Sequence, residues 1–447
     1  MEQQRQYRLP ILVCILLVAA ALAAGLLVSR GAGSGTAEQH LSLGQRYLNE
    51  LNYSGAILEF SNAIRLDPRS KDARVGLAQA YAATGSYDFA ADVLEDVQDP
   101  NRPDEELAAA LVEIYRQGKN YGKAIRLVDE LIGLTDDPQY ETLREELMRA
   151  WYAGSRGWAA GTDQELVIRG GSVMSRGRNT LGQLGTASGL GDPDHEQTDF
   201  LAAAFPGTAR SVYCAGRTSY VLDASGDLWA CGENRWGQMG GSYAATLPES
   251  GWIRLTDSGD VVSLAGTAGR VLVLKLDGTL WEAGAGTGQT LKRVMSFGRV
   301  LQISACGQQL YVLATNGRLF RSSGSDWYLV SKGVVSFCTG DDGAVWLTED
   351  GAIGCEFGLD CPDTWSWQEN GALPPDLEIT AVAGDSSALL MLGADGVLYL
   401  LSDRSVTAAG ETGSIIDLFC ANGMILAQRE DGSLLALQNG RLQPVTL

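Results

Sequence analysis

The spacing of hydrophobic and polar positions divides the chain into three parts. Residues 9–28 form one continuous apolar run without a charge. After a short Gly- and Ser-containing stretch at residues 31–36, residues 37–152 have the pattern of paired helices. From residue 153 to the end, short apolar stretches alternate with small or polar turns that contain glycine, which is typical of strands. The sequence therefore predicts three structural parts joined in series.

The apolar run 9–28 predicts a membrane anchor. A helix of this length crosses the roughly 30 Å of hydrocarbon in a bilayer. A cleaved signal peptide is the alternative, with Ala21–Ala23 as its cleavage site, but its apolar region normally spans only about 7–15 residues. Arg5 and Arg8 precede the run and Arg30 follows it. The positive-inside rule then favours an internal N-terminus and an exported remainder.

A repeat with a period of 34 residues organises residues 37–152. Three series share this interval: Tyr47, Tyr81 and Tyr115; Ala56, Ala90 and Ala124; Leu43, Leu77 and Leu111. The pattern resembles the tetratricopeptide repeat, and the first copy adds Gly44, Phe60, Ala63 and Pro68. One helix pair cannot bury its apolar face alone, so about three units must stack. A last helix, about residues 138–152, is expected to cap the stack.

The resemblance implies a concave peptide-binding groove lined by the first helix of each unit. The residues expected there are Gln45, Asn49, Gln79, Glu113, Arg116 and Gln117. The alternative is a helical spacer that holds the next domain away from the membrane, and the sequence favours neither.

Seven glycine-containing turns recur after residue 153. They centre on Gly171, Gly226, Gly278, Gly317, Gly351, Gly396 and Gly432. Asp-Gly and Asn-Gly pairs supply the positive φ angles of tight hairpins. Seven antiparallel units of this kind predict an all-β, seven-bladed propeller over residues 153–447.

The first two units also contain a longer motif, G-x-N-x-x-G-Q-(L/M)-G, at residues 177–185 and 232–240. With the turns, it resembles the regulator of chromosome condensation repeat over residues 155–447. We therefore interpret the motif as a repeated turn in which Asn234 and Gln238 bond to backbone. That family includes a nucleotide exchange factor for a small GTPase, but no motif for this activity is visible, and fold alone does not imply function.

Composition excludes several kinds of chemistry. The net charge of −20 disfavours nucleic-acid binding. His40 and His195 are the only histidines, which leaves little material for a histidine-based metal site or catalytic triad. Four cysteines fall at or beside the small-residue position of the innermost strands and are expected to be buried thiols: Cys214, Cys306, Cys338 and Cys420. Cys355 and Cys361 could form a local disulfide if the domain is exported.

Two stretches look like ligand sites but lack the required residues. The segment 284–290, GAGTGQT, has Gln289 where a phosphate-binding loop needs lysine. The acidic segment 191–199, GDPDHEQTD, has no calcium-loop spacing. No carboxylate pair is singled out by its spacing. We therefore expect no enzyme activity, no cofactor and no metal.

The sequence thus predicts a single-pass membrane protein, of a bacterial surface, that acts as an interaction scaffold for protein or peptide partners. The propeller residues expected to contact partners are Trp236, Tyr243, Trp252, Trp365 and Trp367. The long loops 186–208 and 241–259 are the expected docking regions. One alternative is a carbohydrate- or cell-wall-binding receptor that uses Trp252, Trp365 and Trp367. A second is a regulator or inhibitor of an extracytoplasmic enzyme.

Overall fold

The protein is described by a computed structural model that divides into two compact units, residues 1–140 and residues 141–447. The residues described are 36–98, 103–154, 156–240, 251–287, 290–340, 343–356, 373–374, 377, 379–385, 387–402, 405–409, 415–421, 424–429, 431, 433–438 and 440–445. No helix within these segments has the length and apolar character needed to cross a bilayer. The predicted anchor, residues 9–28, lies outside them.

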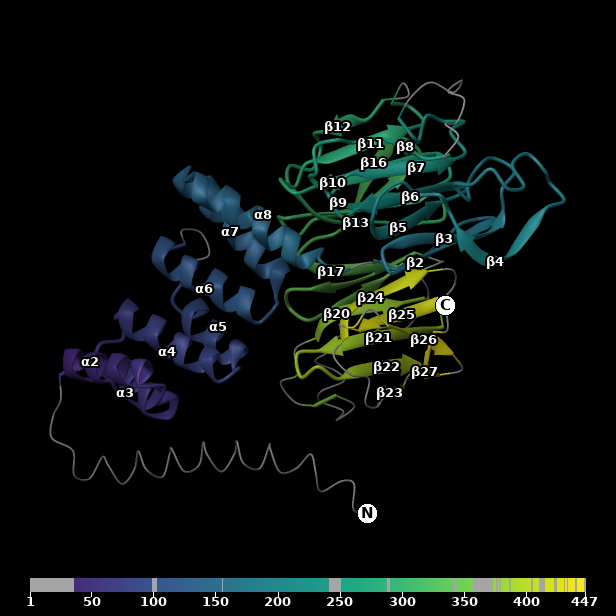
Figure 1. The fold of residues 1–447 in the computed structure, drawn as a ribbon. Helices are drawn as coiled ribbons and strands as arrows, with labels where there is room; N and C mark the ends of the chain where they lie inside the picture. The colour runs from purple at the N-terminus through teal and green to yellow at the C-terminus, as the bar shows by residue number, and fades with distance from the viewer. Residues whose placement is uncertain are drawn as a thin grey trace, which may run out of the picture. The chain divides into compact units, whose positions relative to one another are not determined.

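Seven helices precede the strands in the part of the chain described (Figure 1). They are α2 (Ala37–Asn49), α3 (Tyr53–Leu66), α4 (Lys71–Ala83), α5 (Tyr87–Glu95), α6 (Glu105–Gln117), α7 (Tyr121–Thr135) and α8 (Pro138–Trp151). Side chains of the residues just before α2, α3, α4, α6 and α7 accept hydrogen bonds from the first turn of each helix. These N-caps satisfy backbone donors that the helix leaves unpaired, so the helix starts are encoded locally.

Helices α2 to α7 form the predicted repeat stack. Each contacts the next, and the first helices α2, α4 and α6 also contact one another in order. Phe60 is fully buried at the centre of the first unit. A Cβ atom added to Gly44 or Gly76 would lie 2.8 or 2.4 Å from the Phe60 ring. The two glycines therefore make the space that this ring fills, and the tetratricopeptide-like architecture is confirmed.

Seven antiparallel sheets follow and form the propeller, as predicted (Figure 1). Blade 1 is β1 (Trp158–Ala160), β2 (Gln164–Arg169), β3 (Ser172–Arg178) and β4 (Glu196–Ala202). Blade 2 is β5 (Ala209–Ala215), β6 (Thr218–Asp223), β7 (Leu228–Gly232) and β8 (Ile253–Arg254). Blade 3 is β9 (Val261–Gly266), β10 (Arg270–Lys275), β11 (Leu280–Gly284) and β12 (Lys292–Val294). Blade 4 is β13 (Val300–Cys306), β14 (Gln309–Ala314), β15 (Leu319–Ser323) and β16 (Asp326–Ser331).

The remaining blades follow the same order, and each described sheet is built from consecutive strands. Blade 5 is β17 (Val334–Thr339), β18 (Ala344–Thr348) and β19 (Ile353–Cys355). Blade 6 is β20 (Ile379–Gly384), β21 (Ala388–Gly393), β22 (Leu398–Ser402) and β23 (Ser405–Ala408). Blade 7 is β24 (Ile415–Ala421), β25 (Met424–Arg429), β26 (Leu434–Gln438) and β27 (Arg441–Pro444).

Blade 1 and blade 7 close the ring by apolar packing. Trp158 of blade 1 shares a core cluster with Phe419 and Leu426 of blade 7. The guanidinium of Arg156 lies 5.5 Å from the centre of the Phe419 ring, within reach of a cation–π interaction. The closure of the propeller therefore rests on side chains that are more than 250 positions apart in the sequence.

Candidate interaction surface

The antiparallel order of each blade gives the propeller two different faces. The turns between the second and third strands, which carry the repeated glycines, lie at one end of the blades, and we name this end the turn face. The connections between the first and second strands and between the third and fourth strands lie at the other end. We name that end the loop face, and it contains both copies of the G-x-N-x-x-G-Q motif.

Polar side chains of the motif hold its own backbone. In blade 2, Asn234 Oδ1 accepts a 2.9 Å hydrogen bond from the amide of Met239. Gln238 Oε1 accepts one of the same length from the amide of Trp236. The equivalent bonds in blade 1 run from Leu184 to Asn179 at 2.9 Å and from Leu181 to Gln183 at 2.8 Å. The interpretation of the motif as a turn with internal backbone bonds is confirmed.

The first glycine of the motif cannot carry a side chain. Gly232 has φ +106, and a Cβ atom there would lie 2.4 Å from the carbonyl oxygen of Arg217. Gly177 (φ +111) and Gly284 (φ +118) show the same geometry, with 2.2 Å to a carbonyl oxygen of the preceding turn. Gly284 begins the stretch GAGTGQT. The glycine that resembled part of a phosphate loop is therefore the third copy of this turn glycine.

Each motif loop is also fixed to the next blade. Gln238 Nε2 donates to the carbonyl of Ala268 in blade 3, at 3.3 Å. Ser219 of blade 2 donates to the carbonyl of Gln183 in blade 1, at 2.7 Å. Both glutamines are fully buried. The side-chain oxygens of both glutamines accept hydrogen bonds from their own loop backbone. Because such buried bonds restrict local motion, the loops form a rigid platform.

Two apolar side chains project from this platform. Trp236 is 50% exposed and Leu181 is 36% exposed, and they occupy the same position in the two copies of the motif. The edge of the Trp236 ring lies over Gly269 of blade 3, 3.2 Å from where a Cβ atom would stand. Trp236 was predicted from the sequence as a contact residue, whereas Leu181 was not. Aligning the two motif copies would have identified it.

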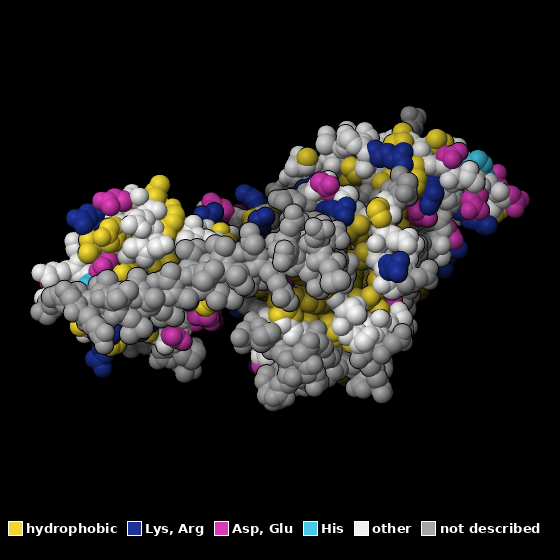
Figure 2. Space-filling view, turned by 90° about the horizontal axis from the view of Figure 1, so that it is seen from below, with side chains coloured by type: hydrophobic (Ala, Val, Ile, Leu, Met, Phe, Trp, Pro, Cys, Tyr) yellow, Lys and Arg dark blue, Asp and Glu magenta, His cyan; other side chains and the backbone are white. Residues whose placement is uncertain are grey.

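Two ion pairs also lie on the loop face. Arg217 Nε lies 2.5 Å from Asp163 Oδ2, and Arg235 Nε lies 3.3 Å from Glu233 Oε1. Both arginines are about half exposed. Exposed pairs of this kind contribute at most about 1 kcal/mol, so a charged group of a partner can replace either contact at low cost. On the side of the molecule in Figure 2, basic and acidic side chains are interspersed over the described surface.

The turn face, in contrast, is partly covered by the protein itself. Arg144 of α8 is fully buried and its Nη1 donates to the carbonyl of Leu276 at 2.7 Å. Glu141 of the same helix forms an ion pair with Arg299. The hydroxyl of Tyr152, just after α8, donates to the carbonyl of Leu301 at 2.9 Å. Glu141 and Arg144 of α8 thus contact blades 3 and 4, which the sequence did not indicate.

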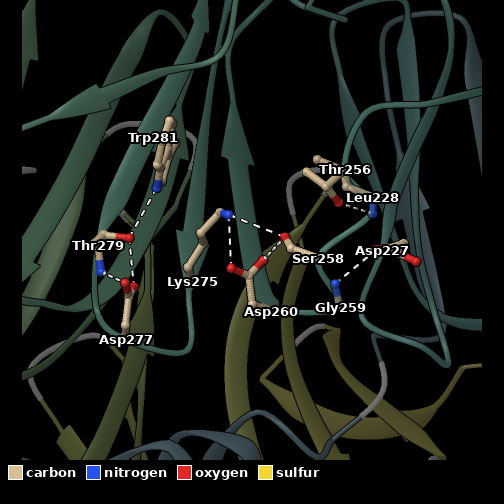
Figure 3. A network of polar contacts seen from close by, with 10 residues as sticks. All are labelled: Asp227, Leu228, Thr256, Ser258, Gly259, Asp260, Lys275, Asp277, Thr279 and Trp281. Carbon is tan, nitrogen blue, oxygen red and sulfur yellow. Dashed lines mark hydrogen bonds and ion pairs between the residues drawn. The ribbon is translucent and has the colours of Figure 1, made fainter. Parts of the chain in front are cut away.

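Further polar contacts on the turn face join blade 2 to blade 3 (Figure 3). Lys275 Nζ lies 2.9 Å from Asp260 Oδ2 and 3.4 Å from Ser258 Oγ. The amide of Gly259 donates to Asp227 Oδ1 at 3.0 Å. The same figure shows bonds from the Leu228 amide to Thr256 Oγ1 and from Trp281 Nε1 to Thr279 Oγ1. The bonds of Asp227 and Leu228 fix the connection between blades 2 and 3 to blade 2, and the bonds of Lys275 fix it to blade 3, whereas the bond of Trp281 lies within blade 3.

The expectation that Trp252 is an exposed anchor is wrong. Its side chain is 2% exposed, and Nε1 donates to the carbonyl of Ala203 at 2.7 Å. The Phe205 ring packs edge-on against it with the centroids 5.4 Å apart. Gly185 leaves the space that the indole fills. Trp252 therefore belongs to the core between blades 1 and 2. Tyr243, Trp365 and Trp367 lie outside the described residues.

The groove residues predicted in the helical unit lie on its first helices, α2, α4 and α6. Gln45, Asn49, Gln79, Arg116 and Gln117 are exposed, and Glu113 is half-buried. Glu113 accepts hydrogen bonds from both Arg116 and Gln117, between 2.7 and 2.8 Å. The bond from Arg116 lowers the pKa of Glu113. The α6 residues thus form one polar cluster, and the equivalent position of α4 presents an amide.

The acidic segment 191–199 forms part of the loop that precedes β4 and the start of that strand. His195 packs against Gly189, and Asp192 accepts a hydrogen bond from the amide of Asp194 at 2.9 Å. Across the described ranges, no three His, Cys, Asp or Glu side chains are arranged to hold a metal ion.

One family model and two solved structures illustrate what the chain is similar to. The family model of the tetratricopeptide repeat matches residues 48–111. The sequence matches no curated protein. Human WBSCR16 has a similar structure, with 16% identity, a TM-score of 0.48, and coverage of 61% of this chain and 86% of the human one. Prp20p of Saccharomyces cerevisiae has 14% identity, a TM-score of 0.48, and coverage of 67% and 89%.

Proposed function

We propose that this protein is a membrane-anchored scaffold that binds protein partners through the loop face of its propeller, and that its activity is binding rather than catalysis. The supporting observation is the pair of equivalent apolar side chains, Leu181 and Trp236, on loops whose backbones are fixed by buried polar side chains. Exposed apolar anchors on rigid supports have the properties of binding hot spots, because little conformational entropy is lost on association.

The occupation of the turn face supports this choice of surface. Helix α8 and Tyr152 already cover part of blades 3 and 4 there. A partner that docks on the turn face would have to avoid α8 and Tyr152, whereas these residues do not obstruct the loop face. The groove of α2, α4 and α6 is the second proposed contact, for an extended peptide that can bond to the exposed amides of Gln45 and Gln79.

Replacing Trp236 with alanine is expected to weaken partner binding by about 30-fold, the effect of removing a hot-spot side chain worth roughly 2 kcal/mol. The measurement is crosslinking of the full chain in its native membrane, with partners quantified by mass spectrometry. Tyr328 is the matched control, because it is 52% exposed but lies on the outer strand of blade 4. Equal recovery of every partner with Trp236→Ala and Tyr328→Ala would contradict the proposal.

The proposed anchor has its own test. The full chain should stay with membranes after an alkaline carbonate wash, whereas a variant without residues 9–28 should appear in the supernatant, because the apolar run supplies the insertion energy. Protease added to intact cells should digest the propeller if the C-terminal units are exported. Extraction of the full chain by carbonate would reject the anchor while leaving the loop-face proposal intact.

The carbohydrate-receptor alternative is weakened because Trp252, one of the side chains expected to stack against a sugar, is buried. The loop-face proposal does not depend on that residue. A glycan array on the full chain distinguishes the two, since saturable sugar binding that survives Trp236→Ala would favour the receptor.

A further inference from the structure

A pocket on the turn face lies where α8 meets blade 3 and the connection to blade 4. Its volume is about 380 Å³, at the lower end of the range for small-molecule sites. All of its lining residues belong to the unit of residues 141–447. Four are charged and two are apolar: Glu141, Asp277, Arg293, Arg299, Val294 and Met295. The scaffold function proposed above does not use this pocket.

Hydrogen bonds and close packing hold the walls of the pocket in place. Arg144 of α8 is fully buried, and Gly278 leaves room for it, because a Cβ atom there would lie 2.2 Å from Arg144 Nη2. Asp277 Oδ1 accepts hydrogen bonds from the amide of Thr279 at 2.8 Å and from its hydroxyl at 2.6 Å (Figure 3). Since these contacts fix both α8 and the turn of blade 3, binding of a small molecule requires little ordering of the protein.

Two of the four charged side chains are available to a ligand. Glu141 and Arg299 form an ion pair with each other. Asp277 and Arg293 are exposed, and neither forms an ion pair within the part of the chain that the structure describes. A ligand with a single charge would be attracted by one of these groups and repelled by the other. A ligand that carries both a positive and a negative charge can pair with both.

The chain next to Arg293 supplies the apolar wall. Val294 is half-buried, and Met295 is 70% exposed at the edge of the pocket. The methionine side chain is flexible and polarisable, so it adapts to apolar groups of different shapes. The pocket thus combines an acceptor for a cation, a donor for an anion and an apolar surface within the space of one small molecule.

We propose that this pocket binds a free α-amino acid with an apolar side chain. The ammonium group pairs with Asp277, the carboxylate pairs with Arg293, and the side chain packs on Met295. A guanidinium presents a fork of N–H donors that matches the two oxygens of a carboxylate. Because both charged groups of the protein are exposed, each contact is weak, and the Kd is expected to be on the order of 1 mM.

The test is saturation-transfer difference NMR on the full chain in detergent, with L-leucine as the probe. N-acetyl-L-leucine lacks the positive charge and L-leucinamide lacks the negative one. Each analogue is expected to bind about 5-fold more weakly than leucine, because it loses one charge contact. The proposal is overturned if leucine gives no saturable signal up to about 10 mM. It is also overturned if either analogue binds as well as leucine, which would indicate a simple anion or cation site.

Four variants locate the binding on the pocket. Arg293→Gln and Asp277→Asn should each weaken leucine binding by about 5-fold, and the asparagine keeps the oxygen that closes the turn. Arg318→Gln and Asp350→Asn are the matched controls, because both residues are exposed on the equivalent turns of blades 4 and 5. Asp350 accepts a bond from the amide of Ala352, as Asp277 does from that of Thr279. Equal loss of binding in the controls would place the site elsewhere and contradict the proposal.

Discussion

Replacing Gly232 with alanine is expected to destabilise the propeller by about 3 kcal/mol. A residue with a side chain is strained at φ +106, and the new Cβ atom would lie 2.4 Å from the Arg217 carbonyl oxygen. The strain arises where the motif loop begins, so blade 2 should open first. The measurement is urea unfolding followed by tryptophan fluorescence. All ten tryptophans lie between residues 151 and 367, so this signal reports on the second unit.

Gly240→Ala is the matched control for this prediction. Gly240 ends the same motif and also has a positive φ, +60, but nothing lies within 4 Å of a Cβ atom there. Its substitution should cost about 1 kcal/mol, the price of the left-handed conformation alone. If the two variants unfold at the same urea concentration, the close approach at Gly232 does not contribute to stability.

Phe60→Ala is expected to destabilise the helical unit by about 3–5 kcal/mol, because it removes a fully buried ring and leaves a cavity between two glycines. Gly44 and Gly76 cannot fill that space, since neither carries a side chain. The repeat stack depends on contacts between neighbouring units, so loss of the first unit should also weaken the second. Unfolding of the helices is followed by far-ultraviolet circular dichroism.

Phe89→Ala is the control for the helical unit. The Phe89 side chain is 63% exposed and its ring contacts Tyr81 at a centroid distance of 5.8 Å. Truncating an exposed ring should change stability by about 0.5 kcal/mol or less. A loss as large as that of Phe60→Ala would show that the glycine-lined site is not the centre of the unit.

Sequence periodicity predicted both folded units because their signals are local. The 34-residue series that begin at Tyr47 and at Ala56 recur once in each helix pair, and each glycine turn of the propeller is recognised from two or three adjacent residues. The same holds for the motif, where Asn234 and Gln238 bond to backbone within five residues. Contacts of this kind can be predicted from the local sequence alone.

In contrast to the repeats, the exposure of aromatic side chains depends on contacts with other blades and could not be predicted from the local sequence. Trp236 and Trp252 lie in the same connection between β7 and β8, and the sequence analysis treated them alike. One is half exposed and the other is buried. The difference is set by Gly185 and Phe205, which come from blade 1 and form the site for the Trp252 indole. No local pattern around residue 252 records this contact.

The sequence by itself determined the two repeat architectures, the turn role of the glycine motif and the apolar character of residues 9–28, because each depends on neighbours along the chain. Only the tertiary structure decided that α8 packs on the turn face through Arg144, that Leu181 joins Trp236 at the loop face, and that Trp252 is buried. The physical reason is that packing between blades brings together residues that are tens to hundreds of positions apart. Contacts of this kind do not produce a repeated pattern in the sequence.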